Sequence, residues 1–494
     1  MDQINKDISN LFASFSKESI ISINKIPQSG SIRIYYRIHT ASKSFIATIG
    51  NNIKENKCFI RFSRHFKMKE CPVPEIFAVN EAANIYIQED FGDVSLLNRL
   101  EQEGTPDHVF GLFKKSLQQL AHLQIQGNRG IDYHTWCLTS SEFGKQAILS
   151  DLLYFKYYFL DTLQLPYDKE KLIADFENFS IGLGNAAYKY FMFRDFQSRN
   201  ILVENEEIHF IDYQGGMRGA LQYDVASLLW QAKAELSAAW KKDLLEYYML
   251  CVEKEMGTQI NKTAFIQQYN GYVLIRLLQV LGAYGFRGLF ERKAHFLVSI
   301  PLGLKNLRSF LTLHELNQDL TAEQNALENN LPEFKRILNL IVDDEIVRRF
   351  VPTRANSETQ LVVHINSFSY RKSIPPDSTE NGGGFVFDCR AILNPGRMET
   401  FKSQTGRDKG VKDFLEQQTK MPEYLNSVFD LVDISVEDYL QRGFKNLQVN
   451  FGCTGGQHRS VYAADSLARH LKNKFGVEIE LHHIEQESKN WQNV

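Results

Sequence analysis

The chain lacks the features that mark several protein classes. Its six cysteines include no Cys-x-x-Cys pair, so neither a zinc site nor a disulfide framework is indicated, and a reducing cytoplasm is expected. The amino terminus has no basic start followed by an apolar run, as a signal peptide would. The most apolar later stretch, Tyr272 to Phe286, is interrupted by Arg276, so no membrane span is predicted.

A surplus of charge is also missing. The chain has 56 basic and 59 acidic residues, and from residue 361 onward there are 16 and 17. Neither the whole chain nor its last part therefore offers the electrostatic attraction on which nucleic-acid or anionic membrane binding depends, and such partners are not expected. With 43% hydrophobic residues and only 12 prolines, the composition is that of a globular protein.

The 494 residues are too many for one ordinary domain, and the apolar pattern changes along the chain. Residues 1–90 read as a small, mostly β lobe with one amphipathic helix near Glu55 to Phe66. Residues 93–350 have helical periodicity, broken by a hairpin-like insert. A polar linker is predicted at 351–360, and strands then alternate with helices over 361–494. The predicted fold is an α+β bilobal domain followed by an α/β domain.

The segment FRDFQSRN carries the first chemical signal. It places Asp195 five residues before Asn200 and seventeen before Asp212, which ends an apolar strand after a hairpin turn. Phosphoryl transfer from ATP needs a carboxylate to orient or deprotonate the attacking hydroxyl, and hard oxygen ligands for magnesium. Asp195 is the candidate for the first role, and Asn200 and Asp212 are candidates for the second.

With these residues in this context, residues 15–345 resemble the aminoglycoside phosphotransferase-like kinases, a branch of the protein-kinase-like fold. QSGSIRIYYRI is similar to the nucleotide loop and following strand, QEDFG to the hinge between lobes, and GALQYDVASLL to the helix after the metal-binding Asp. RDFQSRN, IDYQ and YDVASLL look most like the anomeric kinases of N-acetylmuramate and N-acetylglucosamine. The resemblance implies ATP and Mg²⁺ as cofactors, and a nucleotide site at Gln28, Ser29, Gly30, Ser31, Arg33, Glu89 and Asp90.

The chain departs from the family's pattern in the strand SFIATIG. Ala47 and Thr48 stand where a phosphate-binding Lys is expected, a feature that the amino-sugar kinases share, and Glu55 then lacks its usual partner. Arg33 or Arg37 is a candidate replacement, although an arginine on a strand surface is the more common reading of either position. A binding protein with a kinase fold and no catalysis is the alternative. Phe193 and Gln197 also replace histidines of the family, the first in a packing role.

A second signal is the loop GCTGGQHRS, between a predicted strand and a predicted helix. Unsatisfied N–H groups at a helix start attract anions, so Thr454 to Gln457, Arg459 and Ser460 are expected to hold a phosphate. Cys453 and Arg459 also form a Cys-x5-Arg pattern. Three interpretations stay open: a structural turn, phosphate binding, or a phosphatase with Cys453 as nucleophile and Asp388 or Asp408 as acid.

Residues 361–486 resemble the carboxy-terminal domain of the RNase adapter RapZ, on INSFSYRKSIP, FVFDCRAILNP, TGRDKGVKDFLEQQ and GCTGGQHRS. In that family the domain senses glucosamine-6-phosphate. The resemblance implies sugar-phosphate contacts from Asp388, Arg390, Asn394, Thr454, Gly455, Gly456, His458 and Arg459. RapZ proteins begin with a P-loop domain, but no Gly-x4-Gly-Lys-Ser/Thr occurs here, so the RNA-adapter role is not expected.

Both resemblances indicate amino-sugar metabolism. The first hypothesis is a cytoplasmic ATP-dependent sugar kinase whose last domain binds a sugar phosphate and regulates it. The second is a metabolite sensor with a kinase fold, and the third is a kinase joined to a Cys453 phosphatase. Small molecules are the expected partners, and the sequence identifies no protein partner.

Overall fold

The computed structural model of the chain describes residues 2–26, 33–291, 294–297, 299–316, 331–351, 353–377 and 384–489. It divides into two compact units. The first consists of Met1–Phe286 with Leu302–Val342, and the second of Arg287–Pro301 with Asp343–Val494. Each unit has its own fold, as predicted: the first combines an antiparallel sheet with a mainly helical part, and the second is an α/β domain with a parallel sheet.

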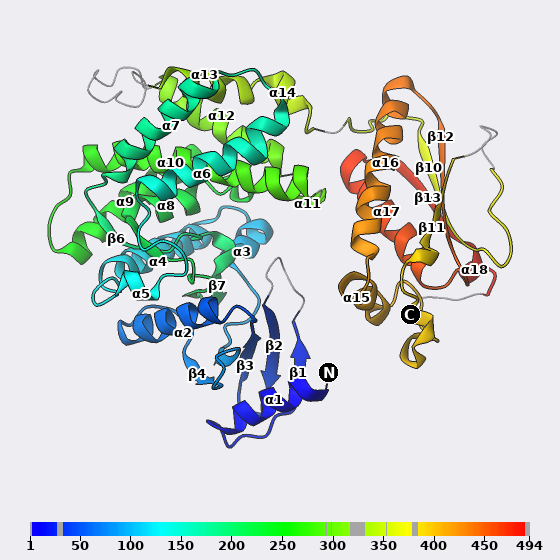
Figure 1. The fold of residues 1–494 in the computed structure, drawn as a ribbon, viewed down its shortest axis with the longest axis horizontal. Helices are drawn as coiled ribbons and strands as arrows, with labels where there is room; N and C mark the ends of the chain where they lie inside the picture. Colours follow the sequence, from blue (N-terminus) through cyan, green and yellow to red (C-terminus); the bar gives the residue numbers. More distant parts are fainter. Residues whose placement is uncertain are drawn as a thin grey trace. The chain divides into compact units, whose positions relative to one another are not determined.

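The first unit begins with an antiparallel sheet in the order β1-β2-β3-β5-β4 (Figure 1). The strands are β1 (Ser22–Lys25), β2 (Ile34–His39), β3 (Ser44–Ile49), β4 (Ile76–Val79) and β5 (Ile85–Glu89). Alternate residues of β2, β3 and β5 form an apolar core with Ile8 and Phe12 of helix α1 (Asp2–Ala13). Because successive side chains of a strand point to opposite faces of the sheet, the other residues of these strands face away from this core.

Helix α2 (Ile53–Met68) connects β3 to β4 and corresponds to the helix predicted near Glu55 to Phe66. Its start is capped by Asn52, whose side chain accepts a hydrogen bond from the N–H of Glu55. This cap fixes the first turn of α2, and with it the position of Glu55.

The remainder of the first unit is mainly helical, as predicted. Its helices are α3 (Leu96–Glu103), α4 (Asp107–Ile125), α5 (Tyr133–Trp136), α6 (Lys145–Phe155), α7 (Lys169–Gly184), α8 (Leu221–Leu229), α9 (Ala238–Met256), α10 (Lys262–Tyr284), α12 (Ile300–Leu316) and α13 (Pro332–Ile341). The predicted hairpin-like insert forms two separate two-stranded antiparallel sheets. β6 (Lys189–Met192) pairs with β9 (Met217–Ala220), and β7 (Ile201–Glu204) pairs with β8 (Glu207–Phe210). The loops that leave β6 and β8 carry the candidate catalytic residues.

The second unit is built on a parallel sheet in the order β11-β12-β10-β13. The strands are β10 (Val362–Ser369), β11 (Phe385–Asp388), β12 (Asn446–Cys453) and β13 (Glu478–His483). The helices are α11 (Ala294–Leu297), α14 (Asp344–Arg348), α15 (Lys409–Gln418), α16 (Met421–Arg442), α17 (Arg459–Phe475) and α18 (Ile484–Glu487). The described residues of the predicted linker at 351–360 form neither helix nor strand.

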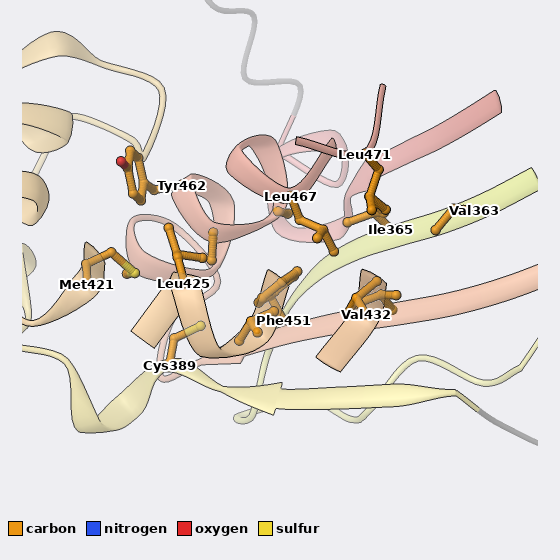
Figure 2. Packing of buried hydrophobic residues seen from close by; sticks show 14 of the residues in the cluster. Val363, Ile365, Cys389, Met421, Leu425, Val432, Phe451, Tyr462, Leu467 and Leu471 are labelled. Atoms are coloured by element: carbon orange, nitrogen blue, oxygen red, sulfur yellow. The ribbon is translucent and has the colours of Figure 1, made fainter. Parts of the chain in front are cut away.

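One apolar core holds the second unit together (Figure 2). Val363 and Ile365 of β10 and Phe451 of β12 pack against Val432 of α16 and Leu467 of α17. Burial of β12 in the sheet interior fixes its carboxyl end at Cys453, where the glycine-rich loop starts. The six cysteines of the chain are all buried and unpaired.

Among the described residues, one helical stretch, Lys262–Phe290, is long and apolar enough to cross a membrane by length and composition. Its 18-residue apolar window has a mean hydropathy of 1.4, but 56% of that window is buried inside the structure. Its buried Arg276 is bonded to other residues of the first unit. Those properties are typical of a core helix of a globular protein.

Candidate functional site

The first unit brings Asp195, Asn200 and Asp212 together. The amide Nδ2 of Asn200 donates to the main-chain oxygen of Asp195 at 2.9 Å and lies 3.4 Å from Oδ2 of Asp212. Asn200 is buried, whereas the side chains of Asp195 and Asp212 are 45% and 42% exposed. Both carboxylates are thus open to ligands.

The donor set fits magnesium. Asn200 uses Nδ2 for its protein contacts, which leaves its amide oxygen for a cation, and Asp212 supplies carboxylate oxygens. Asp212 has a φ of 71°, in the left-handed region that few residues other than glycine adopt, and such conformations cluster at functional sites. The described residues contain no group of three or more His, Cys, Asp or Glu side chains that could hold a metal, so the phosphates of a nucleotide would have to complete the coordination.

Asp224 of α8 holds the backbone that precedes Asp195. Its carboxylate accepts hydrogen bonds from the N–H groups of Phe193 at 2.7 Å and Arg194 at 3.0 Å, and from the amide of Gln124 at 2.8 Å. Burial raises the pKa of Asp224 to about 7, against the lowering effect of these donors. Sequence reasoning identified the helix but not this role, although a lone Asp within the apolar run LQYDVASLL is a usable signal.

Two arginines, the half-buried Arg194 and the buried Arg276, lie near the candidate base. Arg194 binds both carboxylate oxygens of Asp151 at 2.8 Å, and Nη2 of Arg276 lies 3.4 Å from Oδ1 of Asp195. Both guanidinium groups contact the hydroxyl of Tyr223, at 3.1 and 3.4 Å. Burial raises the pKa of Asp151, although Arg194 opposes the effect. Sequence reasoning treated Arg276 only as an interruption of an apolar stretch and missed its place beside Asp195.

Arg33 is buried and faces Asp212, one of the candidate metal ligands. Its Nη2 lies 3.0 Å from Oε1 of Glu55 and 3.6 Å from Oδ1 of Asp212, and its side chain is 7% exposed. Gln214 adds a donor to Asp212 at 2.9 Å. The expectation of an exposed arginine on a strand surface is therefore wrong for Arg33, because its guanidinium turns inward toward two carboxylates.

The side chains of the predicted hinge are occupied by ion pairs. Glu89 pairs with Lys67 at 2.9 Å, and Asp90 accepts from Arg37 at 2.7 Å. Arg37 also pairs with Asp93. Any contact of Glu89 or Asp90 with a nucleotide base would therefore come from their main chain. The predicted loop residues Gln28, Ser29, Gly30 and Ser31 lie outside the described residues.

In the second unit the glycine-rich loop runs from the end of β12 to the start of α17. The Sγ atom of Cys453 accepts the N–H of Gly456 at 3.2 Å and lies 3.1 Å from the hydroxyl of Ser460. Gly456 has a φ of 66°, and a Cβ atom at this position would lie 2.3 Å from Cγ of Glu485. The loop therefore requires glycine at 456 for both its conformation and its packing.

Three predicted phosphate ligands of this loop use their side chains to hold neighbouring backbone. Gln457 donates to the carbonyls of Lys402 and Gln404, and a ring nitrogen of His458 lies 2.9 Å from the carbonyl of Phe401. The Nη1 atom of Arg459 donates to the carbonyls of Arg390 and Ile392, at 3.1 and 2.7 Å. Those bonds join the loop to the segments that follow β11.

The remaining predicted contacts gather beside this loop. Nη2 of Arg459 lies 3.4 Å from Oγ1 of Thr454, and Gly455 is exposed. Asp388 and Arg390 form an ion pair at 2.7 Å, and this partner lowers the pKa of Asp388. The guanidinium of Arg390 lies 4.1 Å from the centre of the Tyr370 ring, and Asn394 accepts the N–H of Gly396.

Comparison with protein families assigns both units. Residues 22–255 match the model of the phosphotransferase enzyme family APH, and residues 361–487 match the RapZ C-terminal domain. A nucleotide-binding protein of Fervidobacterium nodosum is 33% identical over 205 residues, which are 40% of this chain and 67% of that protein. One of Fusobacterium nucleatum is 32% identical over 171 residues, 32% of this chain and 57% of its own length. The chain thus spans about two thirds or less of these relatives.

Solved structures of low sequence identity are also similar to the chain. Choline kinase of Cryptosporidium parvum is 12% identical with a TM-score of 0.46, over 66% of this chain and all of that one. Choline kinase LicA of Streptococcus pneumoniae is 13% identical with a TM-score of 0.41, over 62% of this chain and 99% of its own. The family matches carry the assignment: the chain belongs with the proteins that have a RapZ C-terminal domain, and it joins that domain to one of the phosphotransferase enzyme family.

Proposed function

We propose that the first unit transfers a phosphoryl group from ATP to a hydroxyl of an amino sugar. The observation that carries this proposal is the pair of contacts from Asn200 to the main chain of Asp195 and the carboxylate of Asp212. They put the candidate base and the candidate metal ligands within one small region. That proximity is what phosphoryl transfer requires, because the acceptor hydroxyl and the metal-bound phosphate must meet in line.

Each residue then has a chemical role. The half-exposed carboxylate of Asp195 orients the acceptor hydroxyl and takes its proton as the new P–O bond forms, while the bond from the γ-phosphorus to the bridging oxygen breaks and ADP leaves. The amide oxygen of Asn200 and the carboxylate of Asp212 would hold magnesium, which would supply positive charge to the phosphates. Asp224 keeps the backbone before Asp195 in place through the N–H groups of Phe193 and Arg194.

The acceptor class is proposed from the resemblance of RDFQSRN, IDYQ and YDVASLL to the kinases of N-acetylmuramate and N-acetylglucosamine. We propose that the reaction takes place in the cytoplasm, where unpaired cysteines such as the six of this chain are common. The cofactors are ATP and Mg²⁺, and the partners are a sugar substrate and a sugar phosphate.

The second unit is proposed to bind a phosphorylated amino sugar such as glucosamine-6-phosphate. The loop at Thr454 to Gly456 opens at the start of α17, where main-chain N–H groups and the helix dipole favour an anion. Binding without hydrolysis is favoured over a phosphatase because Cys453 is 3% exposed, so its sulfur has little access to a bound phosphate. Moreover, the paired Asp388 has a lowered pKa, which is unsuited to a general acid.

The kinase proposal is tested by magnesium-dependent ADP release from the purified protein with a panel of reducing amino sugars. Turnover with N-acetylmuramate or N-acetylglucosamine that Asp195→Asn abolishes, with nucleotide binding retained, is the expected result. Binding of ATP without turnover on any sugar would instead favour the metabolite-sensor hypothesis. Calorimetry tests the regulatory role: bound nucleotide and sugar should change the affinity for glucosamine-6-phosphate, since coupling between sites is reciprocal. Equal affinities would contradict it.

A further inference from the structure

Strand β3 of the first unit lacks the lysine that kinases use to contact the nucleotide phosphates. In kinases, a Lys on the third strand of the small lobe pairs with a Glu of the following helix and contacts the nucleotide phosphates. Here β3 has Ala47 and Thr48 at the corresponding point. Ala47 belongs to the apolar core formed with α1, so Thr48 is the one that faces the opposite side of the sheet.

The neighbours of Thr48 identify the residues on that face. Thr48 lies opposite Tyr35 of β2 and opposite Tyr86 of β5. Arg33 precedes Tyr35 by two residues, just before β2, so it has the same parity in the strand as Tyr35. Its Nη1 lies 3.4 Å from the hydroxyl of Tyr86, which confirms that its side chain reaches this face.

The guanidinium of Arg33 lies where the missing ammonium group would act. It is 3.0 Å from Glu55 of α2 and 3.6 Å from Asp212, the candidate magnesium ligand. Arg37, which lies within β2, is instead occupied by Asp90 and Asp93. Arg33, immediately before β2, is therefore the arginine of this segment that carries positive charge to both carboxylates.

We propose that Arg33 takes the place of the absent strand lysine and binds the phosphates of the nucleotide, with Glu55 fixing its position. The inference rests on the proposed kinase function, since it concerns the nucleotide of that reaction. A guanidinium suits this task because it offers several donors in a plane, so that it binds Glu55 and a phosphate oxygen at the same time. The positively charged side chain that binds the phosphates would thus come from the start of β2, instead of from the neighbouring strand β3.

The test compares binding of ATP and adenosine to the full chain, by calorimetry, in Arg33→Met, Arg33→Lys and a control, Arg61→Met. Arg61 is exposed on the same helix as Glu55, and it contacts the carbonyl of Thr135. Arg33→Met should lose about 10- to 100-fold in ATP affinity, the value of a charge-assisted contact, and almost nothing in adenosine affinity. Arg33→Lys should retain part of the affinity, and Arg61→Met should bind both ligands as the unaltered protein does.

A second measurement moves the positive charge from residue 33 to β3. The double variant Arg33→Met/Thr48→Lys returns a positive charge to the same face from β3, and recovery of ATP affinity would support the proposal. An unchanged ATP affinity in Arg33→Met, or equal losses of ATP and adenosine, would overturn it. The binding assay needs no turnover, so it separates this inference from the kinase function: absence of ADP release with any sugar would count against that function alone.

Discussion

Arg276 lies 3.4 Å from the carboxylate of Asp195, although it comes from the middle of the most apolar stretch of the chain. Its side chain is 5% exposed, and it also donates to Gln279 at 2.7 Å. A buried guanidinium is costly unless it is paired, so its place in α10 depends on these acceptors. The consequence is a fixed cation beside the proposed base.

We predict that Arg276→Met lowers kcat about 10- to 100-fold with little change in nucleotide affinity, because Asp195 loses the group that orients it. Arg276→Lys keeps the charge and should retain more activity. Steady-state kinetics with varied sugar and varied ATP would separate the two effects. A loss confined to the KM for ATP would contradict the assignment, and circular dichroism would show whether each variant remains folded.

Asp224 predicts a pH dependence of stability. Because its pKa is raised to about 7 in the folded protein, the folded state keeps a proton that the unfolded state releases near pH 4. The stabilisation is therefore complete below about pH 4 and is lost as the pH rises to about 7. One such proton changes the free energy of unfolding by up to about 1.4 kcal/mol per pH unit.

The variant Asp224→Asn removes this titration, so its free energy of unfolding should vary less between pH 5 and 7 than that of the unaltered protein. Urea unfolding followed by tryptophan fluorescence is suitable, since three of the four tryptophans, Trp136, Trp230 and Trp240, lie in the first unit. Parallel pH profiles for the two proteins would show that Asp224 does not titrate in this range.

The glycine-rich loop makes a prediction about stability in the second unit. Gly456→Ala should lower the free energy of unfolding by about 1–3 kcal/mol, since an alanine is strained at a φ of 66° and its Cβ meets Glu485. Gly455→Ala is the matched control, because Gly455 has no atom within 4 Å of an added Cβ. Calorimetric unfolding of both variants checks this, and equal effects would refute the proposed packing role of Gly456.

Cys453→Ser should leave hydrolysis of p-nitrophenyl phosphate at the background level of the unaltered protein. The sulfur is buried against Gly456 and Ser460, and Nη1 of Arg459 is bound to two carbonyls rather than directed over it. The assay is a colorimetric rate measurement on the full chain. Hydrolysis that depends on Cys453 would restore the phosphatase hypothesis.

The predictable part of the site is the part that is local in sequence. The intervals between Asp195, Asn200 and Asp212 are set by the turn after β6 and the β7–β8 hairpin, so their spacing, read in the context of the predicted lobes and hairpin turn, predicted that these residues meet. The positions of Arg33 and Arg276 could not be predicted in this way. Each contacts a carboxylate far along the chain, and the direction of an arginine side chain depends on packing that no local pattern encodes.

The same distinction applies to the second unit. The alternation of strand-like and helical segments predicted β10, β11, β12 and β13, since short runs rich in apolar and β-branched residues favour strands. It did not predict that Gln457, His458 and Arg459 would bind backbone carbonyls. A polar side chain in a loop can face a ligand or a neighbouring segment, and the segments after β11 lie more than fifty residues away in sequence.

The buried, unpaired cysteines make local unfolding of the protein measurable through their reaction with alkylating reagents. Burial raises the pKa of Cys58 to about 11 and those of Cys71 and Cys389 to about 12, so these thiols react slowly with alkylating reagents while the fold is intact. Four cysteines lie in the first unit, and Cys389 and Cys453 lie in the second. Mass spectrometry after timed alkylation would therefore give a separate opening rate for each unit without any introduced label.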